Sequence, residues 1–249
     1  MFGKIVVPEN LKKESVEVDR LGGDYKVLES GIYVAQIEHA YVTNSASSEA
    51  KGIHLRLKVN ASAMGGSEEQ TFNQTFWITN REGAPTYTNS KGEVKLLAGF
   101  QKMNAFFHLF LGMDITAYSF HKRTFKLYNP ELKEEVPTEV DAIPELIEGY
   151  IGIAVQKLRV NKQEKDSNGV YQNTNEERFI NEIDKFFLLG DDGKAYTLQE
   201  VQAKAEPEFS NAWAAKWTGK VVDKFKETAG ATTVKSTVSN KKPANISIV

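Results

Sequence analysis

An alternating segment near the beginning of the chain constrains the fold more than any other feature. Residues 53–59 read Ile-His-Leu-Arg-Leu-Lys-Val, so apolar and basic side chains alternate without a break. Successive side chains of a β-strand point to opposite faces, whereas a helix would distribute the same pattern around its axis. The segment therefore predicts a strand with an apolar face and a basic face, the latter formed by His54, Arg56 and Lys58.

Two further segments extend this β pattern. Residues 31–42 are rich in aromatic and β-branched side chains, which favour strands. Residues 70–80 alternate again and place Trp77 on the less apolar face of a third strand. If the strands at 53–59 and 70–80 are antiparallel neighbours, the basic side chains and the indole line one surface.

A helix follows these strands. Apolar residues at spacings of three and four predict a core-facing helix over residues 96–111 that ends at Gly112. Several phenylalanines share this helical spacing, so we expect them in the core rather than as platforms for bases: Phe100, Phe106, Phe107 and Phe110.

The second half of the chain contains a strand and a long hairpin. Residues 120–128 predict a strand, and the Pro- and Glu-rich segment that continues to Glu148 predicts a solvated connector. Residues 150–160 and 170–188 predict two paired strands, because the polar segment between them contains an Asn-Gly turn. Short helices are expected near residues 197–205 and 207–218.

The order of these elements predicts a mainly β protein with helices. Three strands, a helix and a two-stranded hairpin match a five-stranded OB-like Greek-key barrel with its helix between strands three and four. Short C-terminal helices complete this expected fold. The expected organisation is an N-terminal arm at 1–28, the OB-fold domain at 29–190, a helical extension at 191–227 and a disordered basic tail at 228–249.

The composition excludes several classes of function. The chain has no cysteine, which excludes disulfides and thiolate metal sites and fits a reducing compartment. No stretch of about 18 apolar residues and no secretory signal occur, so we expect a soluble protein that is neither exported nor bound to a membrane. The net charge of −2 gives no global basic signature, so a nucleic-acid function must depend on where charges lie.

The sequence offers no catalytic constellation. The histidines are scattered without ligand spacing, at His39, His54, His108 and His121. Gly22-Gly23 lacks the lysine of a phosphate-binding loop, and no Gly-x-Ser-x-Gly motif occurs. The carboxylates of residues 131–148 fit a solvated connector better than an acid–base pair. We therefore expect no enzymatic activity, no metal site and no cofactor.

The pattern of basic and aromatic residues indicates single-strand binding instead. Such binding requires a positive groove that follows the backbone and aromatic faces on which bases stack. The candidate DNA-binding residues lie on the first strands, in the loop after the third strand and around the last hairpin: Tyr41, His54, Arg56, Lys58, Trp77, Arg81, Tyr87, Lys91, Lys157, Arg159, Lys162, Lys165 and Tyr171. The alternative is a solvated sheet face. Trp77 favours the DNA interpretation, because an indole on a solvent face usually has a partner.

Several short runs resemble those of tailed-bacteriophage single-stranded-DNA-binding proteins. They are Leu21-Gly22-Gly23-Asp24, Phe76-Trp77-Ile78-Thr79-Asn80-Arg81-Glu82-Gly83, Leu127-Tyr128-Asn129-Pro130 and Lys165-Asp166-Ser167-Asn168-Gly169. The resemblance covers roughly residues 20–220. It implies an OB-fold, sequence-independent binding of single strands in DNA replication and recombination, no cofactor, and the cytoplasm of an infected bacterial host.

The C-terminus departs from this class. Many such proteins end in an acidic tail with a terminal aromatic residue, through which they contact replication proteins. Residues 216–249 instead carry seven lysines and two acidic residues, and the chain ends in Ile246-Ser247-Ile248-Val249. This tail is expected to add phosphate contacts, to bind a phage or host replication protein, or only to increase solubility.

Two functions from different classes remain open. The first is a sequence-independent single-stranded-DNA-binding protein that coats and protects single strands. The second is a non-catalytic phage structural or protein-interaction β-domain that uses Trp77 at a protein interface. A nuclease would need metal ligands that the sequence does not offer. The pattern does not indicate an oligomeric state.

Overall fold

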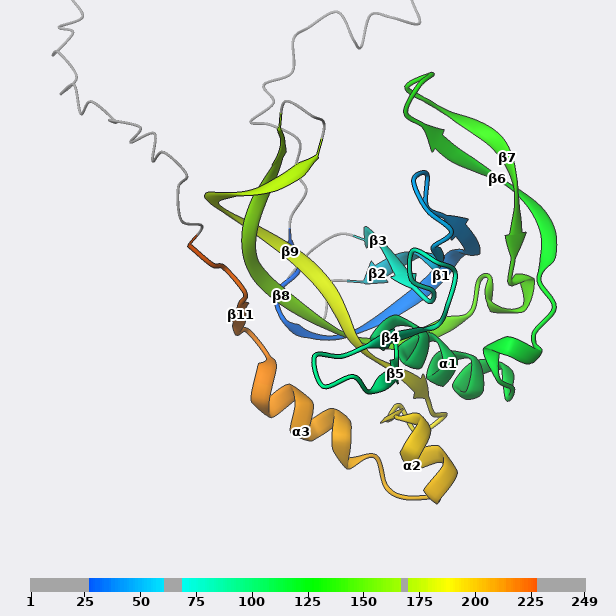
Figure 1. Ribbon diagram of the computed structural model, residues 1–249. Coiled ribbons are helices and arrows are strands. Elements are labelled where there is room, and N and C mark those ends of the chain that lie inside the picture. Colours follow the sequence, from blue (N-terminus) through cyan, green and yellow to red (C-terminus); the bar gives the residue numbers. More distant parts are fainter. Residues whose placement is uncertain (1–26, 61–68, 167–169, 228–249) are drawn as a thin grey trace, which may run out of the picture.

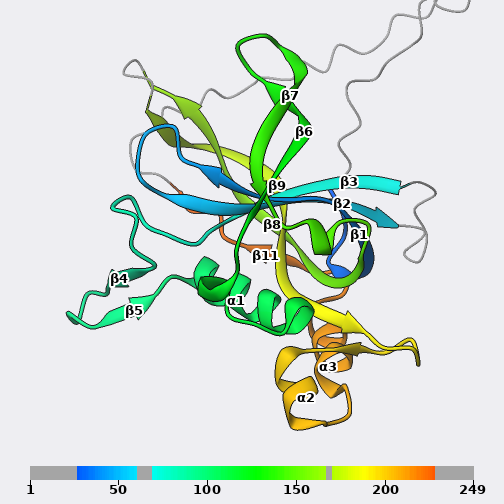
Figure 2. The ribbon, with the colours of Figure 1, turned by 90° about the vertical axis from the view of Figure 1, so that its right-hand side faces the viewer.

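The architecture is an open, curved β-sheet with helices on one side and at one end (Figures 1 and 2). The computed structural model describes residues 27–60, 69–166 and 170–227. Its main sheet consists of β1 (Gly31–Asn44), β2 (Lys51–Asn60), β3 (Glu69–Trp77), β6 (His121–Asn129), β7 (Glu134–Ala142), β8 (Tyr150–Lys165), β9 (Tyr171–Leu189), β10 (Ala195–Tyr196) and β11 (Val221–Asp223). Six strands follow one another in the order β10-β9-β8-β1-β2-β3. The other three join from the side: β11 pairs with β8, β7 with β1, and β6 with β7.

Three α-helices, two single-turn 3-10 helices and one small hairpin complete the part of the chain that the structure describes. They are α1 (Ala98–Leu111), η3 (Ile115–Ala117), η4 (Pro144–Leu146), α2 (Leu198–Ala203), α3 (Glu208–Trp217), and the hairpin of β4 (Thr86–Thr88) and β5 (Val94–Leu96). The expected helix over 96–111 is confirmed as α1, and Gly112 ends it in the left-handed conformation. Thr197 and Glu200 form a capping box that begins α2.

The main core lies between α1 and the inner face of the sheet. This face carries the apolar half of the alternating β2 segment, so Ile53, Leu55 and Leu57 are buried there. From α1, Met103, Phe106 and Phe107 pack against them, as the helical spacing predicts. Because α1 occupies the inner face, the basic half of β2 lies on the outer face.

The prediction of a five-stranded OB-like Greek-key barrel is wrong. The main sheet has nine strands within the described residues, and it stays open because β3 and β9 are not neighbours in it. Side chains bridge the gap instead: Gln74 of β3 accepts a hydrogen bond from the backbone N–H of Ile183 (2.8 Å), and Lys102 of α1 donates to the Ile183 carbonyl (2.6 Å). The order of the elements along the chain does not indicate that side-chain hydrogen bonds replace a backbone ladder between β3 and β9.

The connector expected after residue 128 is also wrong, because most of it is a strand. Residues 134–142 form strand β7, which pairs with β6 along its whole length, from Asn129 opposite Glu134 to His121 opposite Ala142. Pro137 suggested a break, but proline is tolerated where a strand has a single neighbour, and β7 meets β1 only through Ala142. The acidic stretch therefore forms half of a hairpin that rises from the sheet (Figure 1).

The outer face is covered differently at its two ends. At the β8–β9 end, Trp213 of α3 packs on Ala154 and Phe187, and its indole N–H donates to Asp184 (2.7 Å). At the β1–β2 end, the β6–β7 hairpin lies over the sheet.

Among the described residues, no helix is both long and apolar enough to cross a bilayer. The arm expected at 1–28 lies almost entirely outside the described residues, and the tail expected at 228–249 lies wholly outside them.

Candidate nucleic-acid interface

The outer face of β1, β2 and β3 brings basic and aromatic side chains together. In the ladders, Arg56 lies between His39 and Asn73, and His54 lies between Tyr41 and Thr75. Residues opposite one another in antiparallel strands share a face. The basic face predicted from the alternation therefore exists, and β1 adds two rings to it.

The β6–β7 hairpin turns this face into a groove. Phe125 of β6 packs on the rings of His39 and Tyr41, with centroids 4.4 and 5.9 Å apart. Two adjoining hollows of about 560 and 360 Å³ share His39, and we call them together the hairpin groove. Its charged and aromatic lining residues are Glu38, His39, Tyr41, His54, Arg56, Lys58, Arg123, Phe125, Lys126, Tyr128, Glu135 and Glu148.

Acidic side chains hold the two principal cations of the groove. One carboxylate oxygen of Glu38 lies 3.1 Å from Arg56 Nε, and the other lies 3.3 Å from Lys58 Nζ. Glu135 of β7 approaches Arg56 from the hairpin side at 3.8 Å. The groove therefore contains cations that are ordered by ion pairs, and an incoming phosphate has to compete for them.

The two histidines of the groove are held in their neutral form. Burial lowers the pKa of His39, and the nearby Arg56 guanidinium lowers it further. Burial also lowers the pKa of His54, whose Nδ1 lies 3.0 Å from the Thr75 hydroxyl and whose ring packs on Tyr41. At neutral pH the two imidazoles therefore contribute ring faces rather than charge.

Acidification should destabilise the fold through these histidines. A histidine whose pKa is lower in the folded than in the unfolded protein stabilises the fold above the unfolded value of about 6.5. That stability is lost as the pH falls from there through the folded-state pKa. We expect urea unfolding to show a lower free energy of unfolding at pH 5.5 than at pH 7.5, with a smaller loss in the variant His39→Gln/His54→Gln. An equal loss in that variant would assign the pH dependence to carboxylates.

Trp77 lies beside the groove rather than inside its lining. It is the last residue of β3 and lies opposite Gly52, which in turn lies opposite the groove residue Thr43. A Cβ at Gly52 would lie 3.2 Å from the indole, so the glycine leaves room for the ring over β2. Trp77 is 45% exposed. On its backbone side, a Cβ at Gly99 would lie only 2.1 Å from the Trp77 carbonyl oxygen. Glycine at 99 thus lets α1 pack against the backbone of Trp77.

The remaining candidates lie outside the groove. Arg81 is in the turn after β3, Tyr87 is on β4, and Lys91 is in the β4–β5 turn, in a hairpin that stands away from the sheet (Figure 2). On the β8–β9 hairpin, Lys157 pairs with Glu29, Arg159 with Glu177 and Asp223, and Lys162 with Glu164 and Glu176. Lys165 lies 5.3 Å from the centroid of the Tyr171 ring. The structure does not bring these residues together with Arg56.

Strand β6 contributes to the groove, which was not predicted from the sequence. Arg123, Phe125, Lys126 and Tyr128 line the groove, although residues 120–128 were predicted only as a strand. The signal was present, because the strand reads His-Lys-Arg-Thr-Phe-Lys-Leu-Tyr-Asn and is basic and aromatic throughout. It could not be used, since the position of this strand over β1 depends on pairing with a segment expected to be a connector.

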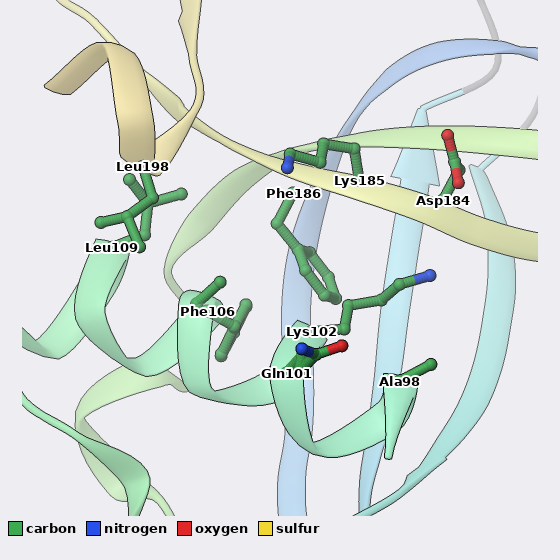
Figure 3. A pocket seen from close by; sticks show the side chains of 10 residues that line it. Ala98, Gln101, Lys102, Phe106, Leu109, Asp184, Lys185, Phe186 and Leu198 are labelled. Atoms are coloured by element: carbon green, nitrogen blue, oxygen red, sulfur yellow. The ribbon is translucent and has the colours of Figure 1, made fainter. Parts of the chain in front are cut away.

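A second cavity, of about 260 Å³, lies between α1, β9 and α2 (Figure 3). Phe106, Leu109, Phe186 and Leu198 make its walls apolar. Its charged groups are engaged in structural contacts: Lys102 donates to the Ile183 carbonyl, Asp184 accepts from Trp213, and Lys185 lies over the Phe209 ring. Burial lowers the pKa of Lys102. We assign this cavity to the packing of α1 and α2 on the sheet.

Comparisons with known proteins add no identification. The chain matches no protein-family model and no curated protein. Within the described ranges, no group of three or more His, Cys, Asp or Glu side chains could hold a metal ion. A functional assignment therefore depends on the chemistry of the hairpin groove.

Proposed function

We propose that this protein binds single-stranded DNA without regard to sequence and that the hairpin groove is its binding site. Such a protein would coat and protect single strands during DNA replication, recombination and repair. The proposal assigns no catalytic role to the groove.

One observation carries the proposal: the groove combines ordered cations with aromatic rings along a continuous surface. Arg56, Lys58, Arg123 and Lys126 line the groove. Tyr128 in the groove and Trp77 beside it are exposed at 63% and 45%. Single-strand binding without sequence preference uses this combination, because every base has a π-face and every nucleotide has a phosphate. A surface for protein recognition would be expected to have fewer charges at its centre.

The shape of the groove supports single-stranded rather than duplex DNA. The groove lies between a sheet and a two-stranded hairpin that packs on that sheet through Phe125, His39 and Tyr41. Proteins that read a duplex insert an element into its groove, whereas this surface is itself concave. Exposed rings at its side would stack on unpaired bases only.

Fluorescence titration with oligo-dT at several salt concentrations tests this function. We expect quenching of tryptophan fluorescence, and an affinity that decreases with salt at a log–log slope of about −0.7 per neutralised phosphate, which is at most about −3 for the four cations of the groove. A blunt duplex of the same length should bind more weakly. A protein-interaction domain, the rival function, would bind neither DNA at any salt concentration.

A further inference from the structure

Glu38 occupies an unusual position in β1. The register between β1 and β2 shifts between Ile37, which faces Leu57, and His39, which faces Arg56. Glu38 is therefore the extra residue of a β-bulge, a feature that redirects a side chain relative to a regular strand. In a regular ladder, Glu38 would lie opposite a β2 residue of its own.

The bulge places the Glu38 carboxylate between the two cations of β2. Each oxygen takes one partner, Arg56 Nε at 3.1 Å and Lys58 Nζ at 3.3 Å. Its side chain is 23% exposed, less than those of either partner at 34% and 44%. Glu38 is therefore the most enclosed of the three residues in this cluster on the wall of the groove.

A phosphodiester has the same recognition chemistry as this carboxylate. It presents two anionic oxygens on one centre, and arginine and lysine bind such groups through charge-assisted hydrogen bonds. We propose that Arg56 and Lys58 form a subsite for one backbone phosphate, and that Glu38 occupies this subsite in the free protein as an internal competitor. This inference rests on the proposed function and adds to it a residue that limits affinity.

The competitor lowers affinity in two ways. A phosphate has to displace Glu38 from both cations before it can bind them, and the displaced carboxylate then lies close to the bound phosphate. Because the cations already have a counter-charge in the free protein, binding also releases fewer counterions than their number suggests. Removal of the charge from Glu38 should therefore increase both affinity and salt dependence.

The test compares the full chain with three variants by oligo-dT titration. Glu38→Gln should bind about three- to tenfold more tightly than wild type, since exposed ion pairs are weak individually. Its salt slope should be steeper by up to about one. Glu206→Gln is the matched control, because it removes the same charge from an ion pair with Lys194 (2.9 Å) outside the groove, and it should bind like wild type. Glu38→Gln/Arg56→Gln should lose the gain.

A second probe separates this inference from the proposed function. Inorganic tripolyphosphate offers phosphates without bases, and it should bind Glu38→Gln more tightly than wild type. Equal affinities of these two proteins for both probes, with unchanged urea unfolding, would overturn the inference even if oligo-dT binds. If oligo-dT binds neither protein while tripolyphosphate distinguishes them, the phosphate subsite stands and the single-strand function fails.

Discussion

Replacement of Trp77 by alanine should weaken oligo-dT binding by about ten- to a hundredfold, since stacking of one base on an aromatic side chain contributes roughly 1–3 kcal/mol. The indole ends β3, lies over Gly52 and is 45% exposed. It is therefore fixed at its backbone and open on a ring face beside the groove. An ordered ring of this kind loses little conformational entropy when a base stacks on it.

Fluorescence anisotropy of an end-labelled oligonucleotide measures this effect without relying on tryptophan emission. Phe209→Ala provides the control, because Phe209 of α3 is also a partly exposed aromatic residue, at 41%, and packs near Phe187 away from the groove. We expect that control to bind like wild type. If Trp77→Ala keeps both wild-type affinity and wild-type urea unfolding, the indole does not stack on DNA.

Local patterns in the sequence predicted the elements that form the centre of the site. The alternation of residues 53–59 fixed both the strand and its two faces, and β2 shows Leu55 buried and Arg56 partly exposed, as that pattern requires. The helical spacing of Met103 and Phe107 likewise identified α1 and its buried side. These patterns are predictive because the polarity of each residue indicates whether its side chain is buried, whichever element packs against it.

Pairing between distant segments could not be read in the same way. Between β3 and β9, the side chains of Gln74 and Lys102 hydrogen-bond the backbone of Ile183 in place of a strand ladder, and nothing in a polar residue of β3 or α1 indicates that role. Strand β7 was missed because its acidic residues are exposed and its Pro137 suggests a break. Strand propensity describes how well a segment fits a pleated surface, and residues 134–142 form a strand because they pair with β6.

Because pairing between distant segments could not be predicted, the candidate residues lie in separate parts of the structure. His54, Arg56 and Lys58 were predicted to share one face, and they line one groove with Tyr41 because they lie on adjacent strands of an antiparallel meander. Glu38 was not considered, since its position depends on a bulge that leaves no local signal. The cations of β8 were included for their charge and their place on the last hairpin, and the structure places Lys157, Arg159 and Lys162 outside the groove, in ion pairs with Glu29, Glu177 and Glu176.

Shortening the β6–β7 hairpin should reduce affinity for oligo-dT by about ten- to a hundredfold and increase the dissociation rate. The change replaces residues 126–137 with Asn-Gly, which joins the paired residues Phe125 and Thr138 by a two-residue turn. It removes the exposed Tyr128 ring, which on stacking contributes roughly 1–3 kcal/mol, and half of one wall of the groove. Phe125 remains, so the packing of the hairpin on His39 is retained.

The matched change shortens the other hairpin. Replacing residues 164–172 with Asn-Gly joins the paired residues Gln163 and Asn173 and removes a tip that bears Lys165 and Tyr171. Because residues 164–166 and 170–172 do not line the groove, stopped-flow dissociation should be close to wild type. The opposite result would follow from the sequence-based prediction, which included Lys165 and Tyr171 among the DNA-binding residues. Faster dissociation after shortening β8–β9, with no change after shortening β6–β7, would therefore move the binding site from the hairpin groove to the longer hairpin.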